Sequence, residues 1–186
     1  MIYLITGASH TGKTLLAQKL LEKFGYPYLS LDLLKMGLIR SGQTELTVTD
    51  SDLLTDYLWS IVKEMIKTAL ENQQHLIVEG SYIPFDWQKD FSSAYLKNIH
   101  YICLIMSDEY IKKSFQNIKK HACAIEKRVD GSYFTLDFAL AENQKYLRLC
   151  QEHGCPYLLL EKDYQPDLIF EKVKRRQDER ENSENI

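Results

Sequence analysis

The fold is decided by the stretch Gly7-Ala8-Ser9-His10-Thr11-Gly12-Lys13-Thr14, which fits the pattern G-x-x-x-x-G-K-[ST]. The apolar and β-branched run before it, residues 1–6, predicts a strand, and apolar residues recur at helical spacing through residues 15–24 after it. A glycine-rich turn between a strand and a helix is the context in which this pattern binds phosphate. The alternative is an ordinary junction between a strand and a helix.

The residue types of this stretch, called the P-loop below, suit a nucleotide. Gly7 and Gly12 let the backbone turn its N–H groups inward, where the amino end of the next helix adds positive potential. Lys13 supplies a catalytic charge for the β- and γ-phosphates of ATP, and the Thr14 hydroxyl is a ligand suited to Mg²⁺. The residues predicted to bind ATP are Gly7, Ala8, Ser9, His10, Thr11, Gly12, Lys13 and Thr14.

Length and composition describe one ordinary globular domain over residues 1–186. The chain is 45% hydrophobic and 26% charged, with a formal net charge of −3, which disfavours a general nucleic-acid binder. No apolar run reaches the roughly 18 residues of a membrane helix, and no signal peptide is recognisable. The four cysteines form no C-x-x-C pair and are interpreted as reduced thiols. We therefore expect a cytoplasmic protein, monomeric or homodimeric, with no membrane or nucleic-acid partner.

An acidic residue follows the second predicted strand. Residues 28–31 form that strand, after a helix stop at Gly25 and Pro27, and Asp32 comes at its carboxyl end. Ligands of open parallel sheets gather at this edge, so Asp32 is predicted to bind the acceptor and act as its catalytic base. The alternative is an N-cap for the short helix 33–39. Arg40, which follows that helix, is a candidate contact for an anionic acceptor, as is Lys35 with less support.

A third predicted strand, residues 75–80, also ends in an acid. Between it and Arg40 lies the strongest helix signal of the chain, residues 50–72, and we take residues 32–74 as an acceptor-binding helical region. Glu79 is predicted to support Mg²⁺ or to bind the acceptor, since a carboxylate at a strand tip beside a P-loop commonly serves the metal. Tyr82 follows and is predicted to line the acceptor site.

The second half of the chain adds two predicted strands, residues 99–106 and 156–160, separated by a lid-like segment at 108–134. This segment is rich in lysine, and Arg128 within it is predicted to neutralise charge in the transition state; a plain amphipathic helix is the alternative. The helix 135–153 carries three further candidates for phosphate contact, Asn143, Lys145 and Arg148. Residues 177–186 are predicted to be a frayed, charged tail.

Five strands that alternate with helices, the first one leading into a P-loop, indicate a doubly wound α/β domain. With the P-loop in this position, the chain resembles the small P-loop kinases of the nucleoside and nucleotide kinase group, including adenylate-kinase-like, shikimate-kinase-like, chloramphenicol-phosphotransferase-like and zeta-toxin-like members. The resemblance implies three α/β/α layers, a five-stranded parallel sheet of order 2-3-1-4-5, and a lid after the fourth strand. The run Ser30-Leu31-Asp32 with Glu79-Gly80 also resembles chains labelled 2-phosphoglycerate kinase.

The sequence departs from true adenylate kinases, which have an Arg-rich lid and an Asp-Gly-Phe-Pro-Arg run after the third strand. This chain has Glu79-Gly80-Ser81-Tyr82-Ile83-Pro84 and a Lys-rich lid instead. The preferred interpretation is therefore ATP- and Mg²⁺-dependent phosphorylation of a small-molecule hydroxyl. The alternatives are a regulatory ATPase or switch module, a kinase of nucleoside monophosphates, and a toxin-like kinase of nucleotide sugars that has an antitoxin partner. No N-K-x-D run for guanine occurs, which disfavours a GTPase.

Overall fold

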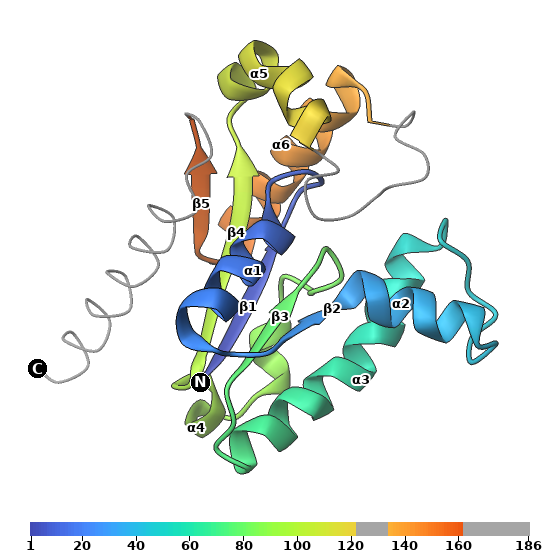
Figure 1. Cartoon of the computed structure of the whole chain (residues 1–186), viewed down its shortest axis with the longest axis vertical. Helices are drawn as coiled ribbons and strands as arrows, with labels where there is room; N and C mark the ends of the chain where they lie inside the picture. Colours follow the sequence, from blue (N-terminus) through green and yellow to red (C-terminus); the bar gives the residue numbers. More distant parts are fainter. Residues whose placement is uncertain (122–133, 162–186) are drawn as a thin grey trace, which may run out of the picture.

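The computed structural model describes residues 1–121 and 134–161, and its centre is a parallel five-stranded sheet. The strands are β1 (Ile2–Gly7), β2 (Tyr28–Ser30), β3 (Leu76–Glu79), β4 (Ile99–Met106) and β5 (Tyr157–Leu160). Their order is β2-β3-β1-β4-β5, and every neighbouring pair is parallel (Figure 1). The predicted sheet and strand order are therefore confirmed.

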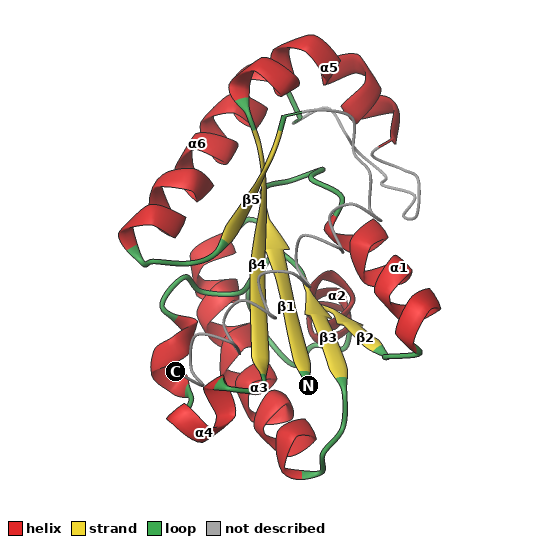
Figure 2. Cartoon of the chain, turned by 90° about the vertical axis from the view of Figure 1, so that its left-hand side faces the viewer, coloured by secondary structure: helices red, strands yellow, loops and turns green. Residues whose placement is uncertain are grey.

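Helices cover both faces of the sheet (Figure 2). They are α1 (Lys13–Phe24), α2 (Leu31–Arg40), α3 (Ser51–Glu71), α4 (Ser93–Leu96), α5 (Asp108–His121), α6 (Leu136–Glu152) and the 3₁₀ helix η1 (Trp87–Asp90). One apolar cluster joins the sheet to α1 and α5, and the other joins it to α3, η1 and α4; α6 contributes to both. These layers follow from the sequence, because strands buried on both faces read as continuous apolar runs.

The alternation of side chains along β4 shows how one strand supplies both clusters. Ile99, Tyr101 and Cys103 point into the cluster on the α3 side, whereas Ile102 and Leu104 point into the cluster on the α1 side. All five are buried, as the period-two geometry of a central strand requires. The site described below therefore stands on a sheet whose middle strands are fixed from both faces.

Helix boundaries agree with the predicted ones to within one or two residues at most ends, with one consequential exception. The strand predicted over residues 28–31 ends at Ser30, because Leu31 already begins α2. Ser30 is the N-cap residue of that helix and Asp32 lies in its first turn, so the alternative role of Asp32 as the N-cap is wrong. Asp32 is thus carried by a helix and not by a strand tip.

Two predictions fall partly or wholly outside the described residues. The lid-like segment 108–134 is represented by α5 and Phe134, and Arg128 lies outside the described ranges. The predicted tail at 177–186 also lies outside them. Among the helices that the structure describes, none is long and apolar enough to span a bilayer.

Candidate functional site

The register of the sheet brings the predicted site residues together at the carboxyl ends of the strands, which are called the sheet edge below. Glu79 of β3 pairs with Ile5 on β1 and with Ser30 on β2, and the Gly80 amide donates to the Ile5 carbonyl at 3.0 Å. The end of β3 therefore lies between the strand that leads into the P-loop and the residue that precedes α2. Parallel strands end at the same edge, where ligands of such sheets bind. The P-loop, Glu79 and the start of α2 meet there.

The P-loop begins at a position that only glycine can occupy. Gly7 has φ of +143°, and a Cβ built on it would lie 2.2 Å from the carbonyl oxygen of Leu104 on β4. Gly12, with φ of +84°, is the N-cap residue of α1, and its carbonyl accepts the Leu16 amide at 2.9 Å. The two glycines, with four residues between them, thus let the chain leave the sheet and enter the helix. Helix α1 begins at Lys13, which puts its positive end at the loop.

Two side chains close the P-loop over one carbonyl. The Thr11 hydroxyl and the Lys13 ammonium both donate to the carbonyl oxygen of Ala8, each at 2.8 Å. Both side chains are buried, so the ammonium of Lys13 lies back over the loop and does not extend into solvent. A lysine in this position presents its charge to any anion held by the surrounding amides.

Thr14 and Glu79 form the pair predicted to hold a metal. The Thr14 hydroxyl donates to Glu79 Oε2 at 3.3 Å, and Glu79 is only 1% exposed. A hydroxyl and a carboxylate oxygen are hard ligands of the kind that Mg²⁺ takes, with water and phosphate oxygens completing its octahedron. The chemistry of this pair therefore fits Mg²⁺. The described residues contain no cluster of three or more His, Cys, Asp or Glu side chains arranged to hold a metal by themselves.

Asp32 belongs to a three-residue polar cluster that also contains Lys35 and Tyr82. The Lys35 ammonium donates to Asp32 Oδ1 at 2.5 Å and to the Tyr82 hydroxyl at 3.0 Å, and it lies 4.8 Å from the centre of the Tyr82 ring. Burial by itself lowers the pKa of Lys35, but the hydrogen bonds to Asp32 and Tyr82 outweigh it and raise the pKa above its usual value. Lys35 therefore stays cationic beside Asp32 at neutral pH.

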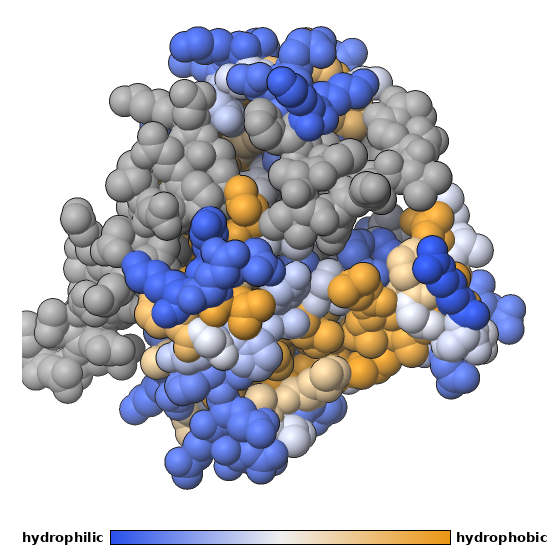
Figure 3. Space-filling view, viewed as in Figure 1, coloured by the Kyte–Doolittle hydropathy of each residue, from blue (hydrophilic) through white to orange (hydrophobic). Residues whose placement is uncertain are grey.

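Two other residues predicted to contact ligands, Arg40 and Asn143, do not contact the groups described above. Arg40 is exposed at the last residue of α2, with Leu33 exposed on the same helix. Figure 3 shows apolar residues gathered over α2 and α3. The exposed large hydrophobic residues in this part of the chain include Leu33 on α2, Val48 in the connection between the helices, and Leu53 on α3. Asn143 is buried, accepts the Met106 amide at 2.8 Å and donates to the Ala139 carbonyl at 2.8 Å. It fastens α6 to the end of β4 and does not present its amide to a phosphate.

The sequence does not indicate that Glu142 contacts the P-loop. Glu142 of α6 accepts two hydrogen bonds from Ser9, one from the amide at 2.7 Å and one from the hydroxyl at 3.0 Å. The next residue of the loop, His10, has φ of +63° and stacks on Phe134, with ring centres 3.9 Å apart and planes within 6°. The sequence separates these partners by more than 120 residues, and no spacing rule connects an acid on a helix to a phosphate-binding loop.

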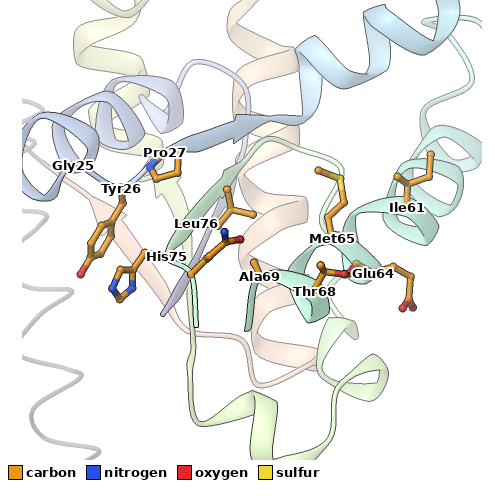
Figure 4. A pocket seen from close by; sticks show the side chains of 11 residues that line it. Gly25, Tyr26, Pro27, Ile61, Glu64, Met65, Thr68, Ala69, His75 and Leu76 are labelled. Carbon is orange, nitrogen blue, oxygen red and sulfur yellow. The ribbon is translucent and has the colours of Figure 1, made fainter. Parts of the chain in front are cut away.

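A separate groove lies near the amino ends of β2 and β3. It has a volume of about 790 Å³. Residues from the turn after α1, from α3 and from the start of β3 line it (Figure 4). Tyr26 and His75 stack at its rim with ring centres 4.2 Å apart. Because Pro27 precedes β2 and Leu76 begins β3, the groove lies at the amino ends of these strands. It is therefore distant from the P-loop, which follows the carboxyl end of β1.

Several solved structures with a similar fold are kinases. The deoxyadenosine kinase from M. mycoides, solved with dCMP and dCDP, aligns with a TM-score of 0.57 at 13% identity, over 96% of this chain and 100% of that one. A shikimate kinase from Bacteroides thetaiotaomicron aligns with a TM-score of 0.51 at 14% identity, over 97% and 98%. The chain has the fold of the small P-loop kinases. A gluconokinase from Sinorhizobium meliloti 1021 also aligns, with a TM-score of 0.50 at 13% identity, over 95% and 91%.

These similarities show the shared fold of the small P-loop kinases and not a shared substrate. The sequence matches no protein-family model and no curated protein closely enough to assign it to a family. Another structure of the M. mycoides enzyme carries dATP, at 16% identity to this chain and a TM-score of 0.56. The chemistry of the protein therefore depends on the residues at the carboxyl ends of the strands.

Three of the described residues are cysteines that lie in the apolar cluster on the α3 side of the sheet. Cys103, Cys150 and Cys155 are buried and form no disulfide. Burial raises the pKa of Cys103 well above that of a free thiol, and it raises the pKa of Cys155 to about 11. Both stay protonated at neutral pH, and the Cys155 thiol donates to the Phe85 carbonyl at 3.0 Å. They act as packing residues in the cluster beneath α6.

Proposed function

We propose that the chain is an ATP-dependent phosphotransferase that phosphorylates a hydroxyl group of a small-molecule acceptor. The observation that carries this proposal is the convergence of three groups on one sheet edge: the P-loop with Lys13, the Thr14–Glu79 pair, and the Asp32–Lys35–Tyr82 cluster. A nucleotide switch needs only the first two of these. The third is a carboxylate paired to a half-buried cation next to a hydroxyl, which is an arrangement for handling a second polar substrate.

The nucleotide side of the proposal follows from the loop. Backbone amides, the amino end of α1 and the Lys13 ammonium together stabilise the polyphosphate of ATP. Thr14 and Glu79 would hold Mg²⁺, which neutralises charge on the transferred phosphoryl group when it is bound. Because Glu79 is buried, its carboxylate is fixed in place before any ligand arrives. The fold of the kinases that align with this chain, one of which binds dATP, supports this half of the proposal.

The acceptor side of the proposal depends on Asp32. Its carboxylate takes the proton of the acceptor hydroxyl, whose oxygen forms a bond to the γ-phosphorus while the bond from that phosphorus to the ADP oxygen breaks. Phosphorylated acceptor and ADP are released. The hydrogen bond from Lys35 holds Asp32 in place, and Tyr82 completes the cluster. Arg40 and Arg128 are proposed to bind anionic groups of the acceptor and of the transferred phosphate, respectively. Most of the rate arises from alignment and charge neutralisation.

The wider proposal keeps the predicted organisation. Residues 1–186 form one kinase domain, with residues 32–74 as the acceptor-binding region, and α2 and α3 occupy this part of the chain. We propose a cytoplasmic enzyme that acts as a monomer or homodimer on metabolites. Helix α2 carries Asp32 and Lys35, which supports an acceptor site in that region.

The test is a screen of phosphorylatable metabolites with ATP and Mg²⁺, in which the release of ADP is measured. Wild-type protein should release ADP only with the correct class of acceptor, and Lys13→Ala should abolish transfer while its melting temperature stays unchanged. The matched control is Lys19→Ala on the same helix, where Lys19 pairs with Glu22 on the exposed side at 3.2 Å. Nucleotide binding without acceptor-dependent transfer would favour the switch module, and retained transfer in Lys13→Ala would remove the P-loop from the mechanism.

A second pair of variants tests whether Asp32 is the catalytic base. Asp32→Asn should lower kcat by about 10²–10⁴ while ATP affinity stays within twofold, because general-base catalysis contributes in that range. Asp52→Asn, an exposed residue in the first turn of α3, is the control and should leave kcat unchanged. Equal kcat values for both variants would show that Asp32 is not the base.

A further inference from the structure

Glu142 uses both carboxylate oxygens on a single residue of the P-loop. Oε2 accepts the Ser9 amide at 2.7 Å, and Oε1 accepts the Ser9 hydroxyl at 3.0 Å. Hydrogen bonds to an ionised carboxylate are stronger than neutral ones, and a two-point contact fixes orientation as well as distance. The Ser9 amide is therefore directed at α6 and does not face a phosphate while this contact is made.

The next residue of the loop is held by the same part of the chain. His10 stacks on Phe134 at 3.9 Å, and Phe134 is 1% exposed because it also packs on Phe115, with ring centres 5.6 Å apart. His10 adopts a positive φ, which is unfavourable for a residue with a Cβ. Such a conformation persists only where neighbouring contacts impose it, and the stack on Phe134 is one such contact.

The helix that carries Glu142 has two further contacts near the site. Asn143, the next residue, accepts the amide of Met106 at the end of β4. One turn further along, the Tyr146 hydroxyl donates to the Ser81 carbonyl at 3.4 Å. Glu142 and Tyr146 are four residues apart and share a helix face. Helix α6 thus reaches from the P-loop to the segment that carries Tyr82.

We propose that Glu142 is a positioning residue of the nucleotide site: it holds the Ser9 corner of the P-loop against α6 and so raises the affinity for ATP. The inference rests on the proposed function. A loop whose backbone is ordered before binding does not lose that conformational freedom when the phosphate arrives, and ordering one residue corresponds to about a factor of ten in affinity. Glu142 opposes the phosphates through its charge, and the gain in order exceeds this repulsion because Lys13 and the amino end of α1 neutralise the phosphates.

Two substitutions separate hydrogen bonding from charge. Glu142→Gln keeps an acceptor for the Ser9 amide and offers a donor to the Ser9 hydroxyl, but it removes the charge. Glu142→Ala removes both contacts. In calorimetric titrations with ATP and Mg²⁺, Ala should weaken binding about tenfold, whereas Gln should bind as tightly as the wild type or more tightly. Glu152→Ala on the same helix, where Glu152 pairs only loosely with Arg148 at 3.6 Å, is the control and should bind normally.

Two further readouts distinguish positioning from a loss of folding. The Ser9 amide should exchange with deuterium faster in Glu142→Ala than in Glu142→Gln, while the melting temperatures of the two variants agree. With an acceptor in hand, Ala should raise the KM for ATP about tenfold and leave kcat within twofold. Unchanged ATP affinity in Ala, or equal weakening in Ala and Gln, would overturn the inference about Glu142. Failure of the wild type to bind ATP would instead overturn the proposed function, and this inference with it.

Discussion

Replacement of Gly7 by alanine tests whether the P-loop is fixed by the sheet beneath it. Gly7 is the last residue of β1 and lies opposite Leu104 on β4. An added Cβ would lie 2.2 Å from the Leu104 carbonyl oxygen and 2.8 Å from its amide nitrogen. Close C···O contacts in proteins are about 3.3 Å, so the overlap is about 1 Å. These neighbours are backbone atoms of a central strand, and no side-chain rotation relieves the clash.

The expected loss of stability for Gly7→Ala is about 4 kcal/mol. A φ of +143° costs a residue with a Cβ about 1–3 kcal/mol, and the clash requires β1 and β4 to separate locally. Separation leaves at least one buried backbone group unsatisfied, which costs a further 1–3 kcal/mol or so. For a domain of this size, about 4 kcal/mol lowers the melting temperature by roughly 10 °C. ATP binding should be lost as well, because the loop starts at the displaced position.

Urea unfolding followed by circular dichroism measures the change, with Gly37→Ala as the internal control. Gly37 lies inside α2, and a Cβ there meets nothing within 4 Å. Alanine at that position should stabilise the protein by about 0.5–1 kcal/mol, because glycine is a poor helix former. If Gly7→Ala unfolds within about 1 kcal/mol of the wild type, the register of β1 against β4 or the conformation of Gly7 is not as described, and the reasoning about the loop fails.

Three further outcomes are expected. Asp90 accepts from Trp59 Nε1 at 2.8 Å and from Lys63 at 2.9 Å; although burial raises its pKa, these two contacts lower it overall. The Asp90 carboxyl therefore binds a proton more readily in the unfolded chain than in the folded one. Near neutral pH the wild type should be more stable than Asp90→Asn by about 1–2 kcal/mol. This difference should be lost as pH falls below about 4, and a difference that does not depend on pH would contradict the expectation. Glu79→Gln should raise the Mg²⁺ concentration for half-maximal activity about tenfold, with unchanged values pointing to another ligand. Lys35→Met should lower kcat about tenfold while ATP affinity measured by titration is unchanged; weaker ATP binding would place Lys35 on the nucleotide side.

The fold was predictable because its signals are local. Each strand is a short apolar run, α3 repeats its apolar residues every three or four positions, and α1 ends where Gly25 adopts φ of +69°. The strand order was not available from these patterns; it came from the resemblance that the P-loop suggested. The single boundary that mattered, the end of β2, was misplaced because Leu31 suits a strand as well as the first turn of a helix.

The site was predictable where it follows the strand ends and unpredictable where it depends on packing. Glu79 could be singled out because an acid that ends an apolar strand must lie at the ligand-binding edge. Lys35 received little weight, since a lone lysine on a short helix is usually solvated, and only the fold shows its ammonium between Asp32 and Tyr82. Glu142 was missed altogether. An acid near a phosphate site contradicts simple charge matching, and its partner is 133 residues away.

The strand order divides the site into two halves with different tasks. Because β1 is central, the P-loop is flanked on one side by β3 and β2 and on the other by β4 with α6. The first side supplies Glu79 and Asp32, the groups proposed to act on the metal and the acceptor. The second side supplies Glu142, which acts on the loop itself. Changes on the β3 side should therefore alter kcat or metal dependence, whereas a change at Glu142 should alter ATP affinity. A Glu142 variant with normal ATP affinity and impaired kcat would show that the two halves do not divide the work in this way.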